Sequence, residues 1–304
     1  MERFTFEITE EYDNLRIDKC LSGLVDSLSR SYIQKIIKDG AVYVNGIPVK
    51  ASYKVAEEDV VEFELPDASV PDIKAENIPL DIIYEDKDLI VVNKPKGMVV
   101  HPAPGHYSGT LVNALMYHCK SELSGINGVM RPGIVHRIDR DTTGSVIVCK
   151  NDVAHAHIAE QLKVHSITRK YHAICHGVIK EDAGTINATI GRHPQDRKKM
   201  AVNVPNGKEA ITHYRVLKRF KKYTYVECEL ETGRTHQIRV HMASIGHPLL
   251  GDEVYANRKT NYKLQGQTLH AKVLGFEHPT THIYQETDAP MPEYFMHLLD
   301  ILEQ

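Results

Sequence analysis

The stretch PDASVPDIKAENIP, residues 66–79, constrains the fold of this chain more than any other feature. It is rich in proline and acidic residues and has the period of neither a helix nor a strand, which is typical of a linker. The 304 residues are 42% hydrophobic, so both sides of this interruption have apolar side chains for a core. We therefore predict an N-terminal domain over 13–66, a linker over 67–79 and a larger domain over 80–304.

The N-terminal segment has the pattern of two helices followed by a hairpin. Helices are predicted over 14–25 and 29–40, and strands within 41–49 and 59–65. In the second helix Ser29 or Ser31 can cap the start, and Gly40 can end it. The isoleucines of this helix recur at the spacing of one helix face, so we expect them in the core.

The second helix also carries a basic face. Arg30, Gln34 and Lys38 lie on one predicted outer surface, with Lys35 beside them. Taken alone, such a face is typical of a solvated helix. The order RIDKCL, SRSYIQKIIKDG and AVYVNG, however, resembles the S4 RNA-binding module, whose helix pair presents basic side chains to structured RNA. The resemblance implies RNA as a partner, contacted by Arg16, Arg30, Lys35 and Lys38.

The larger segment alternates short strands with few helices. Strands are predicted within 80–95, 168–177 and 223–233, and helices within 109–119 and 151–163. The second of these helices can start on Asn151 or Asp152 as its cap. Because strands and helices do not alternate regularly, the pattern favours an α+β fold over βαβ repeats.

The segment GIVHRIDRDTTGSVIVCK, residues 133–150, places an unusual amount of charge in one turn. Its two arms favour strands and DTTG has turn chemistry, so Asp139 is expected on a loop at a sheet edge. A solvated turn explains Asp141 well, because Asp in such a place commonly bonds its own backbone. Asp139 is flanked by Arg137 and Arg140, and opposite charge favours the ionised form that a nucleophilic carboxylate requires. Spacing alone leaves both readings of Asp139 open.

The same turn, HRIDRDTTG, resembles the HRLDxxTSG signature of the RluA-type pseudouridine synthases. The resemblance extends in order over further segments at 93–102, 169–177, 231–242, 247–255 and 269–279. The segments HPAPGHYSGTLVNAL and GRHPQDRKKMAV are most similar to the RluD subgroup, which modifies uridines of large-subunit ribosomal RNA. The departures are small, such as Ile138 for Leu and Arg140 for Lys. The resemblance implies the pseudouridine synthase fold, with a mixed, mainly antiparallel central sheet, and an isomerase that acts on RNA.

The resemblance also assigns roles in the site. It implies that Asp139 is the catalytic residue, acting at C1' of the nucleoside, at C6 of the base or in elimination at the sugar. Tyr171 matches the family's active-site tyrosine, which would stack on the uracil and could deprotonate C5. We expect Arg234 to pair with Asp139, because arginine offers a planar, permanently charged fork. Arg239 is expected in a strand, at Asp139 or at an RNA phosphate.

Net charge is −3, so whole-protein attraction cannot bring in RNA and local basic patches must do so. The family resemblance places an RNA-gripping loop at RHPQDRKKM. The RNA contacts expected in the larger domain are Arg137, Arg140, Arg192, Arg197, Lys198, Lys199 and Arg239. Uridine isomerisation needs no second substrate and no redox change, so we expect neither cofactor nor metal. We also expect a cytoplasmic monomer without membrane contact, since no stretch approaches the ~20 apolar residues of a membrane span.

Two other functions are compatible with parts of the sequence. One is a non-catalytic RNA binder in ribosome assembly, which the presence of Asp139, Tyr171 and Arg234 disfavours. The other is a metal-dependent phosphodiesterase or hydrolase using Asp139, Asp141 and nearby histidines, although no further ligands appear at a recognisable spacing. The sequence leaves open which uridines are modified, and whether free ribosomal RNA or an assembling particle is the substrate.

Overall fold

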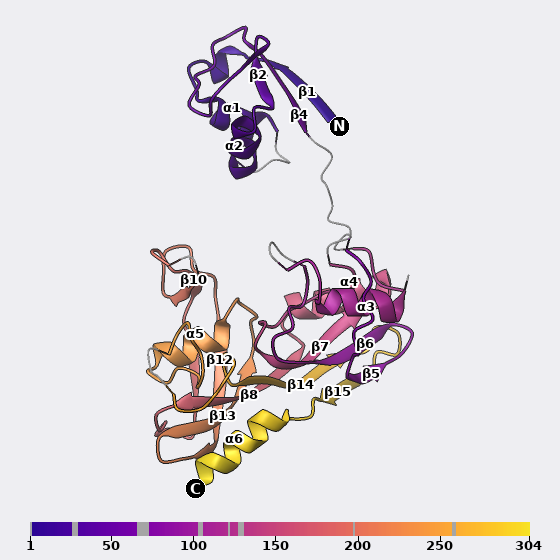
Figure 1. The fold of residues 1–304 in the computed structure, drawn as a ribbon, viewed down its shortest axis with the longest axis vertical. Coiled ribbons are helices and arrows are strands. Elements are labelled where there is room, and N and C mark those ends of the chain that lie inside the picture. Colours follow the sequence, from indigo (N-terminus) through magenta and orange to yellow (C-terminus); the bar gives the residue numbers. More distant parts are fainter. Residues whose placement is uncertain are drawn as a thin grey trace. The chain divides into compact units, whose positions relative to one another are not determined.

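The computed structural model describes residues 2–25, 30–65, 73–102, 106–120, 122–126, 131–196, 198–256 and 260–304 (Figure 1). The chain divides into two compact units, Met1–Val70 and Pro71–Gln304. Ser29 and Arg197, which the sequence suggested as a helix cap and an RNA contact, lie outside the described residues, as do the side chains of Ser31 and Lys35. No helix in these ranges is both long and apolar enough to cross a membrane.

The first unit packs two helices, α1 (Ile17–Leu24) and α2 (Arg30–Lys38), against a four-stranded antiparallel sheet in the order β1-β4-β2-β3. The strands are β1 (Glu2–Glu7), β2 (Val42–Val44), β3 (Ile47–Pro48) and β4 (Val60–Leu65), with a 3-10 turn at Glu10–Tyr12. Strand β1 was not predicted from the sequence; it pairs with β4 along its whole length. The alternation of Phe4 and Phe6 with polar residues is its signal, and Phe4 stacks on Phe63 with ring centroids 5.0 Å apart.

A buried carboxylate changes the interpretation of the basic helix face. Asp18 of α1 is fully buried and accepts hydrogen bonds from Arg16 Nε at 3.0 Å, Arg30 Nη2 at 3.0 Å and Gln34 Nε2 at 2.6 Å. Burial raises the pKa of this carboxyl, but the three donors outweigh it and hold the pKa well below its usual range. The Arg30–Gln34 edge of α2 therefore faces α1 and is not simply an outer surface. Both arginines keep about half of their side chains exposed, at 48% for Arg16 and 52% for Arg30.

The second unit is built on a nine-stranded sheet in the order β5-β6-β7-β14-β8-β13-β12-β9, with β15 added to β14. The strands are β5 (Ile82–Glu85), β6 (Leu89–Lys94), β7 (Thr143–Cys149), β8 (Thr168–His176), β9 (Ala183–Asn187), β12 (Ile211–Arg219), β13 (Tyr223–Leu230), β14 (Leu269–Glu277) and β15 (Tyr284–Asp288). Among the pairs in the described part of this sheet, β7 with β14 is parallel and the others are antiparallel. This mixed, mainly antiparallel sheet with few helices confirms the predicted α+β class.

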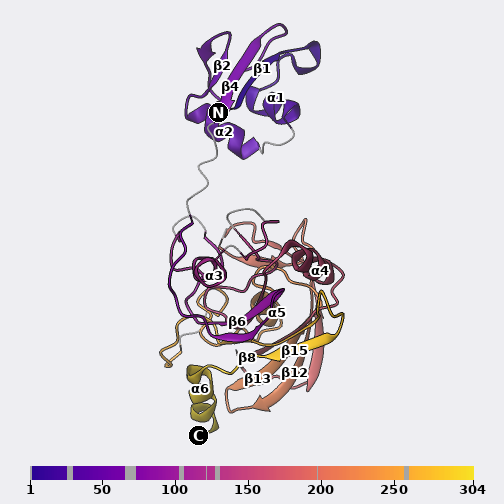
Figure 2. The same ribbon diagram turned by 90° about the vertical axis from the view of Figure 1, so that its right-hand side faces the viewer.

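Four helices cover parts of this sheet: α3 (Leu111–Cys119), α4 (Asp152–Lys163), α5 (Gln237–Ser244) and α6 (Glu293–Glu303). The sequence predicted α3 and α4 correctly. Asn151 is the cap of α4, and its side chain accepts the Ala154 N–H at 2.9 Å. Helix α6 lies beside β8 and β13 (Figure 2), and Phe295 of α6 shares a buried cluster with Ile174 of β8.

The strand expected around Arg239 was wrong, because this segment is α5. Its sequence, QIRVHMAS, includes the β-branched Ile238 and Val240, which favour strands. All residues from Gln237 to Met242 are buried, so the helix has no polar face to reveal a helical period. Tertiary packing here overrides local preference.

Candidate active site

A buried lysine, Lys94, donates a hydrogen bond to the backbone of the turn that carries Asp139. Lys94, at the end of β6, is fully buried, and its ammonium donates to the carbonyls of Pro95 at 2.9 Å, Met98 at 2.8 Å and Arg140 at 2.9 Å. Three acceptors match the three donors of an ammonium group. Burial lowers the pKa of Lys94 to about 7, against the opposing pull of nearby carboxylates. The 93–102 motif therefore fixes the backbone next to Asp139.

Gly144 sets the register that brings the HRIDRDTTG turn beside Tyr171. It has φ +106°, and a Cβ there would lie 2.3 Å from the carbonyl oxygen of Ala271. Only glycine allows β7 and β14 to approach this closely. Ala271 pairs with Gly144 on one side and with Tyr171 of β8 on the other. The strand order thus places the Asp139 turn and Tyr171 at one site.

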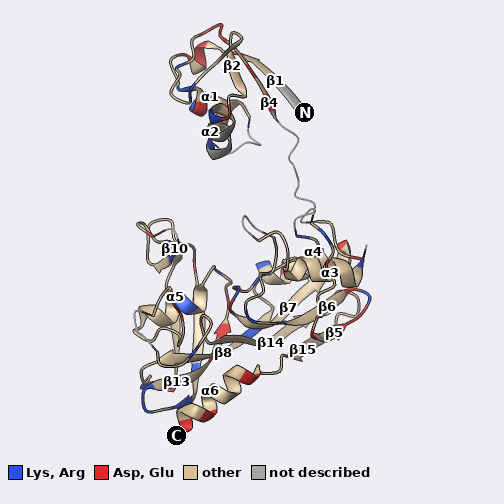
Figure 3. Ribbon diagram, viewed as in Figure 1, with Lys and Arg blue, Asp and Glu red and all other residues tan. Residues whose placement is uncertain are grey.

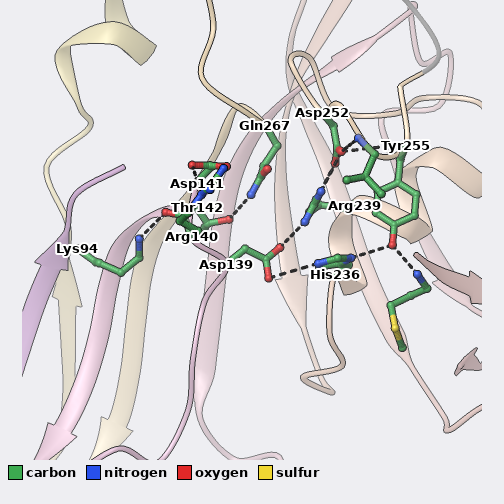
Figure 4. A network of polar contacts seen from close by, with 12 residues as sticks. Lys94, Asp139, Arg140, Asp141, Thr142, His236, Arg239, Asp252, Tyr255 and Gln267 are labelled. Carbon is green, nitrogen blue, oxygen red and sulfur yellow. Dashed lines mark hydrogen bonds and ion pairs between the residues drawn. The ribbon is translucent and has the colours of Figure 1, made fainter. Parts of the chain in front are cut away.

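Asp139 forms an ion pair with Arg239, a residue of α5. Arg239 Nη1 donates to Asp139 Oδ2 at 2.8 Å, while its Nε and Nη2 donate to the two carboxylate oxygens of Asp252 at 2.7 and 2.9 Å (Figure 4). Asp252 is buried and also accepts the backbone N–H groups of Val254 and Tyr255. Arg239 therefore uses the planar fork of its guanidinium to join the two carboxylates.

The charges of this network stabilise each other. Burial works against the charge of Arg239, but the hydrogen bonds and charge of Asp252, and after it those of Asp139, raise the pKa of the guanidinium above its ordinary value. Tyr255 adds its aromatic face, 5.3 Å from the guanidinium carbon. Arg239 is thus a permanent cation that orients Asp139.

The expectation that Arg234 pairs with Asp139 is corrected by this geometry. Arg234 Nε donates to the Glu209 carbonyl at 2.8 Å, and its backbone N–H donates to Gln237 Oε1 at 2.9 Å. Arg234 precedes α5, whereas Arg239 lies within it and reaches the carboxylate. Both arginines line the same cleft.

The charges next to Asp139 in the sequence are paired differently from the prediction. Arg140 Nε and Nη2 donate to the Asp141 carboxylate at 3.2 and 3.0 Å. Asp141 thus pairs with the side chain of Arg140, whereas the sequence predicted a hydrogen bond to its own backbone. Arg140 is therefore engaged by Asp141 and not by Asp139. Arg137 lies on the wall of the cleft.

Asp139 and Tyr171 lie on one cleft of about 530 Å³, within the ~300–1,000 Å³ typical of small-molecule sites. Leu230, Ile238 and Leu269 provide apolar walls. Burial raises the pKa of the Tyr171 hydroxyl, and Arg169 opposes this effect. The cleft combines the Asp139 carboxylate, the Tyr171 ring, apolar side chains and several cations, which suits a flat, partly polar ligand that carries negative charge nearby.

Sequence reasoning missed several residues of the site. Lys94, Asp252 and Tyr255 stand in segments that carried the family resemblance, but no roles were attached to them. Arg169 is also buried at the cleft; its Nη2 donates to the Glu231 carbonyl at 2.8 Å, and among the described residues its Nε has no hydrogen-bond partner. His236 joins the network through its ring nitrogens. The motifs themselves were the only available signal for these residues.

Strands β10 (Ile190–Arg192) and β11 (Met200–Val202) form a hairpin at the basic segment RHPQDRKKM. The hairpin stands away from the main sheet (Figure 1). Its loop is closed by a hydrogen bond from the His193 N–H to the Lys199 carbonyl at 3.1 Å. Arg192 and Lys198 are exposed. This agrees with the projecting basic loop expected from the sequence.

Potential metal ligands gather elsewhere. Within the described ranges, the groups of side chains close enough to share an ion are Glu85, His118 and Cys119; His157, Glu277 and His282; and Asp86, Asp88 and His278. These groups include neither Asp139 nor Asp141.

The fold is that of a pseudouridine synthase. A solved structure named Human RNA Pseudouridylate Synthase Domain Containing 4 matches 73% of this chain and 92% of its own, with a TM-score of 0.58 and 25% identity. The model of the RNA pseudouridylate synthase family matches residues 88–244, just over half of the chain, and that of the S4 domain matches residues 15–61. The chain therefore belongs to the RNA pseudouridylate synthase family.

Full-length relatives agree. A Bacillus subtilis protein named Uncharacterized RNA pseudouridine synthase YlyB is 54% identical over 100% of this chain and 99% of its own length. A Zymomonas mobilis protein named Ribosomal large subunit pseudouridine synthase D is 46% identical over 97% of this chain and 96% of its own. The resemblance to the RluD subgroup is confirmed by such relatives.

Proposed function

We propose that this synthase converts uridines of large-subunit ribosomal RNA to pseudouridine, with Asp139 as the catalytic residue. The observation that carries the proposal is the Asp139 carboxylate, held by Arg239 at 2.8 Å on a cleft that Tyr171 also lines. The ribosomal substrate is supported by relatives named Ribosomal large subunit pseudouridine synthase D.

The reaction breaks the bond from C1' to N1, turns the uracil and joins C1' to C5, after which C5 loses its proton and N1 gains one. Because Arg239 holds Oδ2 of Asp139, Oδ1 is the atom we assign to act on the nucleoside. The raised pKa keeps the Tyr171 hydroxyl protonated at neutral pH, which makes it a poor base. We therefore assign Tyr171 to stacking on the uracil rather than to deprotonation of C5.

The base must leave its stack to enter a cleft of this kind, so the RNA has to be gripped on both sides of it. Arg137 on the cleft wall and Arg192, Lys198 and Lys199 of the β10–β11 hairpin provide cations for this.

In the first unit Arg16, Arg30 and Lys38 are exposed. The helix α6, by contrast, carries acidic residues and neither lysine nor arginine (Figure 3). We assign the RNA to the basic elements and not to α6.

The test is to map pseudouridine in total RNA from cells with and without the gene. We expect specific large-subunit ribosomal RNA positions to lose the modification and to regain it when the gene is restored. An unchanged ribosomal pattern with a loss in transfer RNA would leave the enzyme class intact and contradict the proposed substrate.

We also propose that the S4 unit is a separate docking module. Deleting residues 1–70 removes one compact unit and leaves the nine-stranded sheet and its cleft. The shortened enzyme is expected to fold and to remain weakly active, with poorer RNA affinity and selectivity. Measurements are circular dichroism, RNA binding at several salt concentrations and pseudouridine yield on matched and unmatched RNA. Insolubility, or full selectivity, would contradict a separate module.

A further inference from the structure

A line of polar contacts runs from the basic hairpin to Asp139. The backbone N–H of Met200 in β11 donates to the Tyr255 hydroxyl oxygen at 2.8 Å. The same hydroxyl lies 2.9 Å from Nδ1 of His236, and Nε2 of His236 lies 4.0 Å from Oδ1 of Asp139. Figure 4 shows Tyr255, His236 and Asp139 in this order. The hydrogen bond from Arg239 engages the other carboxylate oxygen of Asp139, Oδ2.

The hydrogen-bond pattern favours one of the two imidazole nitrogens as the carrier of the proton. A backbone N–H can only donate, so the Tyr255 oxygen accepts from Met200. Among the contacts of the described residues, Nδ1 of His236 is then the acceptor for the hydroxyl proton. Burial lowers the pKa of His236, with Asp139 opposing, which favours the neutral ring. A neutral ring that accepts at Nδ1 carries its proton at Nε2, toward Asp139.

The backbone fixes His236 in this place. Its φ is 57°, in the left-handed region that non-glycine residues seldom adopt. The Val240 N–H donates to its carbonyl at 2.9 Å as α5 begins. The edge of the ring also faces the Tyr255 ring, with centroids 5.7 Å apart and an interplanar angle of 83°. The ring therefore sits between Tyr255 and Asp139.

We propose that Tyr255 and His236 are positioning residues that connect the β10–β11 hairpin to Oδ1 of Asp139. This inference rests on the proposed function, in which Asp139 acts on uridine and the hairpin contacts RNA. The Nε2–H group is roughly 1 Å beyond hydrogen-bonding distance from Oδ1. When RNA engages the hairpin, Met200 and Tyr255 shift His236 toward Asp139, which orients Oδ1 for the nucleoside. Binding of RNA by the hairpin and orientation of the Asp139 carboxylate are thus coupled.

Tyr255→Phe is the first test, because it keeps the ring over Arg239 and removes only the hydroxyl. We expect the single-turnover rate on saturating ribosomal RNA fragment to fall roughly tenfold, the effect of one hydrogen bond. RNA affinity is expected to stay within about twofold. Tyr84→Phe is the matched control, since it removes a hydroxyl bonded to Asp86 outside this site. A normal rate for Tyr255→Phe, or a loss confined to affinity, would overturn the proposal.

His236 allows a second test that does not depend on Tyr255→Phe folding well. His236→Gln places an amide where Nε2 lies and loses the contact at Nδ1, whereas His236→Asn keeps an amide near Nδ1 and loses the one facing Asp139. Both are expected to slow turnover. Adding Tyr255→Phe to His236→Gln should cost nothing more, because the link is already broken. Additive losses would show two independent structural roles and refute the connection.

A third arm tests the hairpin end. In the native background Lys198→Ala is expected to lower both RNA affinity and the saturated single-turnover rate; in the Tyr255→Phe background it should lower affinity alone. An equal rate effect in both backgrounds would refute transmission through Tyr255. Native enzyme that forms no pseudouridine in the ribosomal fragment would instead contradict the proposed function, which separates the two failures.

Discussion

Replacing Asp139 with asparagine is expected to abolish pseudouridine formation while RNA binding persists. Asparagine has the size of aspartate and still offers one oxygen to Arg239, so the turn and the cleft should survive. It lacks the anionic oxygen that we assign to act on the nucleoside. The assay is tritium release from 5-tritiated uridine in ribosomal RNA, with binding measured on the same RNA. Normal turnover by this variant would contradict the proposed chemistry.

Asp141→Asn is the matched control, two residues away in the same turn. Its carboxylate pairs with Arg140, whose side chain is 55% exposed, and the amide oxygen of asparagine can still accept a hydrogen bond from that guanidinium. We expect this variant to retain most of its activity. If Asp141→Asn were inactive and Asp139→Asn active, the catalytic carboxylate would have to be reassigned.

The parts of the fold that sequence could predict are those encoded by neighbouring residues. Asn151 caps α4 through its own side chain, and Thr110 and Asn113 form the capping box of α3. The strand β1 was missed although Phe4 and Phe6 alternate with polar residues, because so short an alternation does not reveal the pairing with β4, far along the chain. Helix α5 was missed because burial all round removes the amphipathic pattern. Local signals are sufficient for capped helices but not for elements that depend on distant partners.

The candidate site shows the same division. A motif could point to Asp139 and Tyr171, but their closeness depends on β14, which pairs with Gly144 and Tyr171 through one residue, Ala271. Sequence could not choose between the two arginines that follow ETG. That choice depends on the left-handed backbone of His236, from which the helix begins.

Arg239→Lys is expected to be the second most damaging substitution. Arg239 makes three hydrogen bonds from one rigid fork, two to Asp252 and one to Asp139. A lysine keeps the charge but is a point donor that cannot span both carboxylates. The buried Asp252 is then poorly paired and Asp139 is no longer oriented. We expect the turnover rate to fall on the order of 100-fold, as for loss of an oriented charge contact in an active site, together with a lower melting temperature.

Arg234→Lys separates this effect from a general need for arginine at the cleft. Arg234 is partly exposed, and within the described part of the chain its side chain donates to the carbonyl of Glu209. An ammonium can make one such contact, so we expect the rate to change less than about threefold, within the range of one modest hydrogen bond. Both variants are compared by tritium release and by thermal unfolding. Asp139 pairs with Arg239 and not with Arg234 in this structure. An inactive Arg234→Lys variant together with an active Arg239→Lys variant would therefore mean that Asp139 changes its arginine partner when RNA binds.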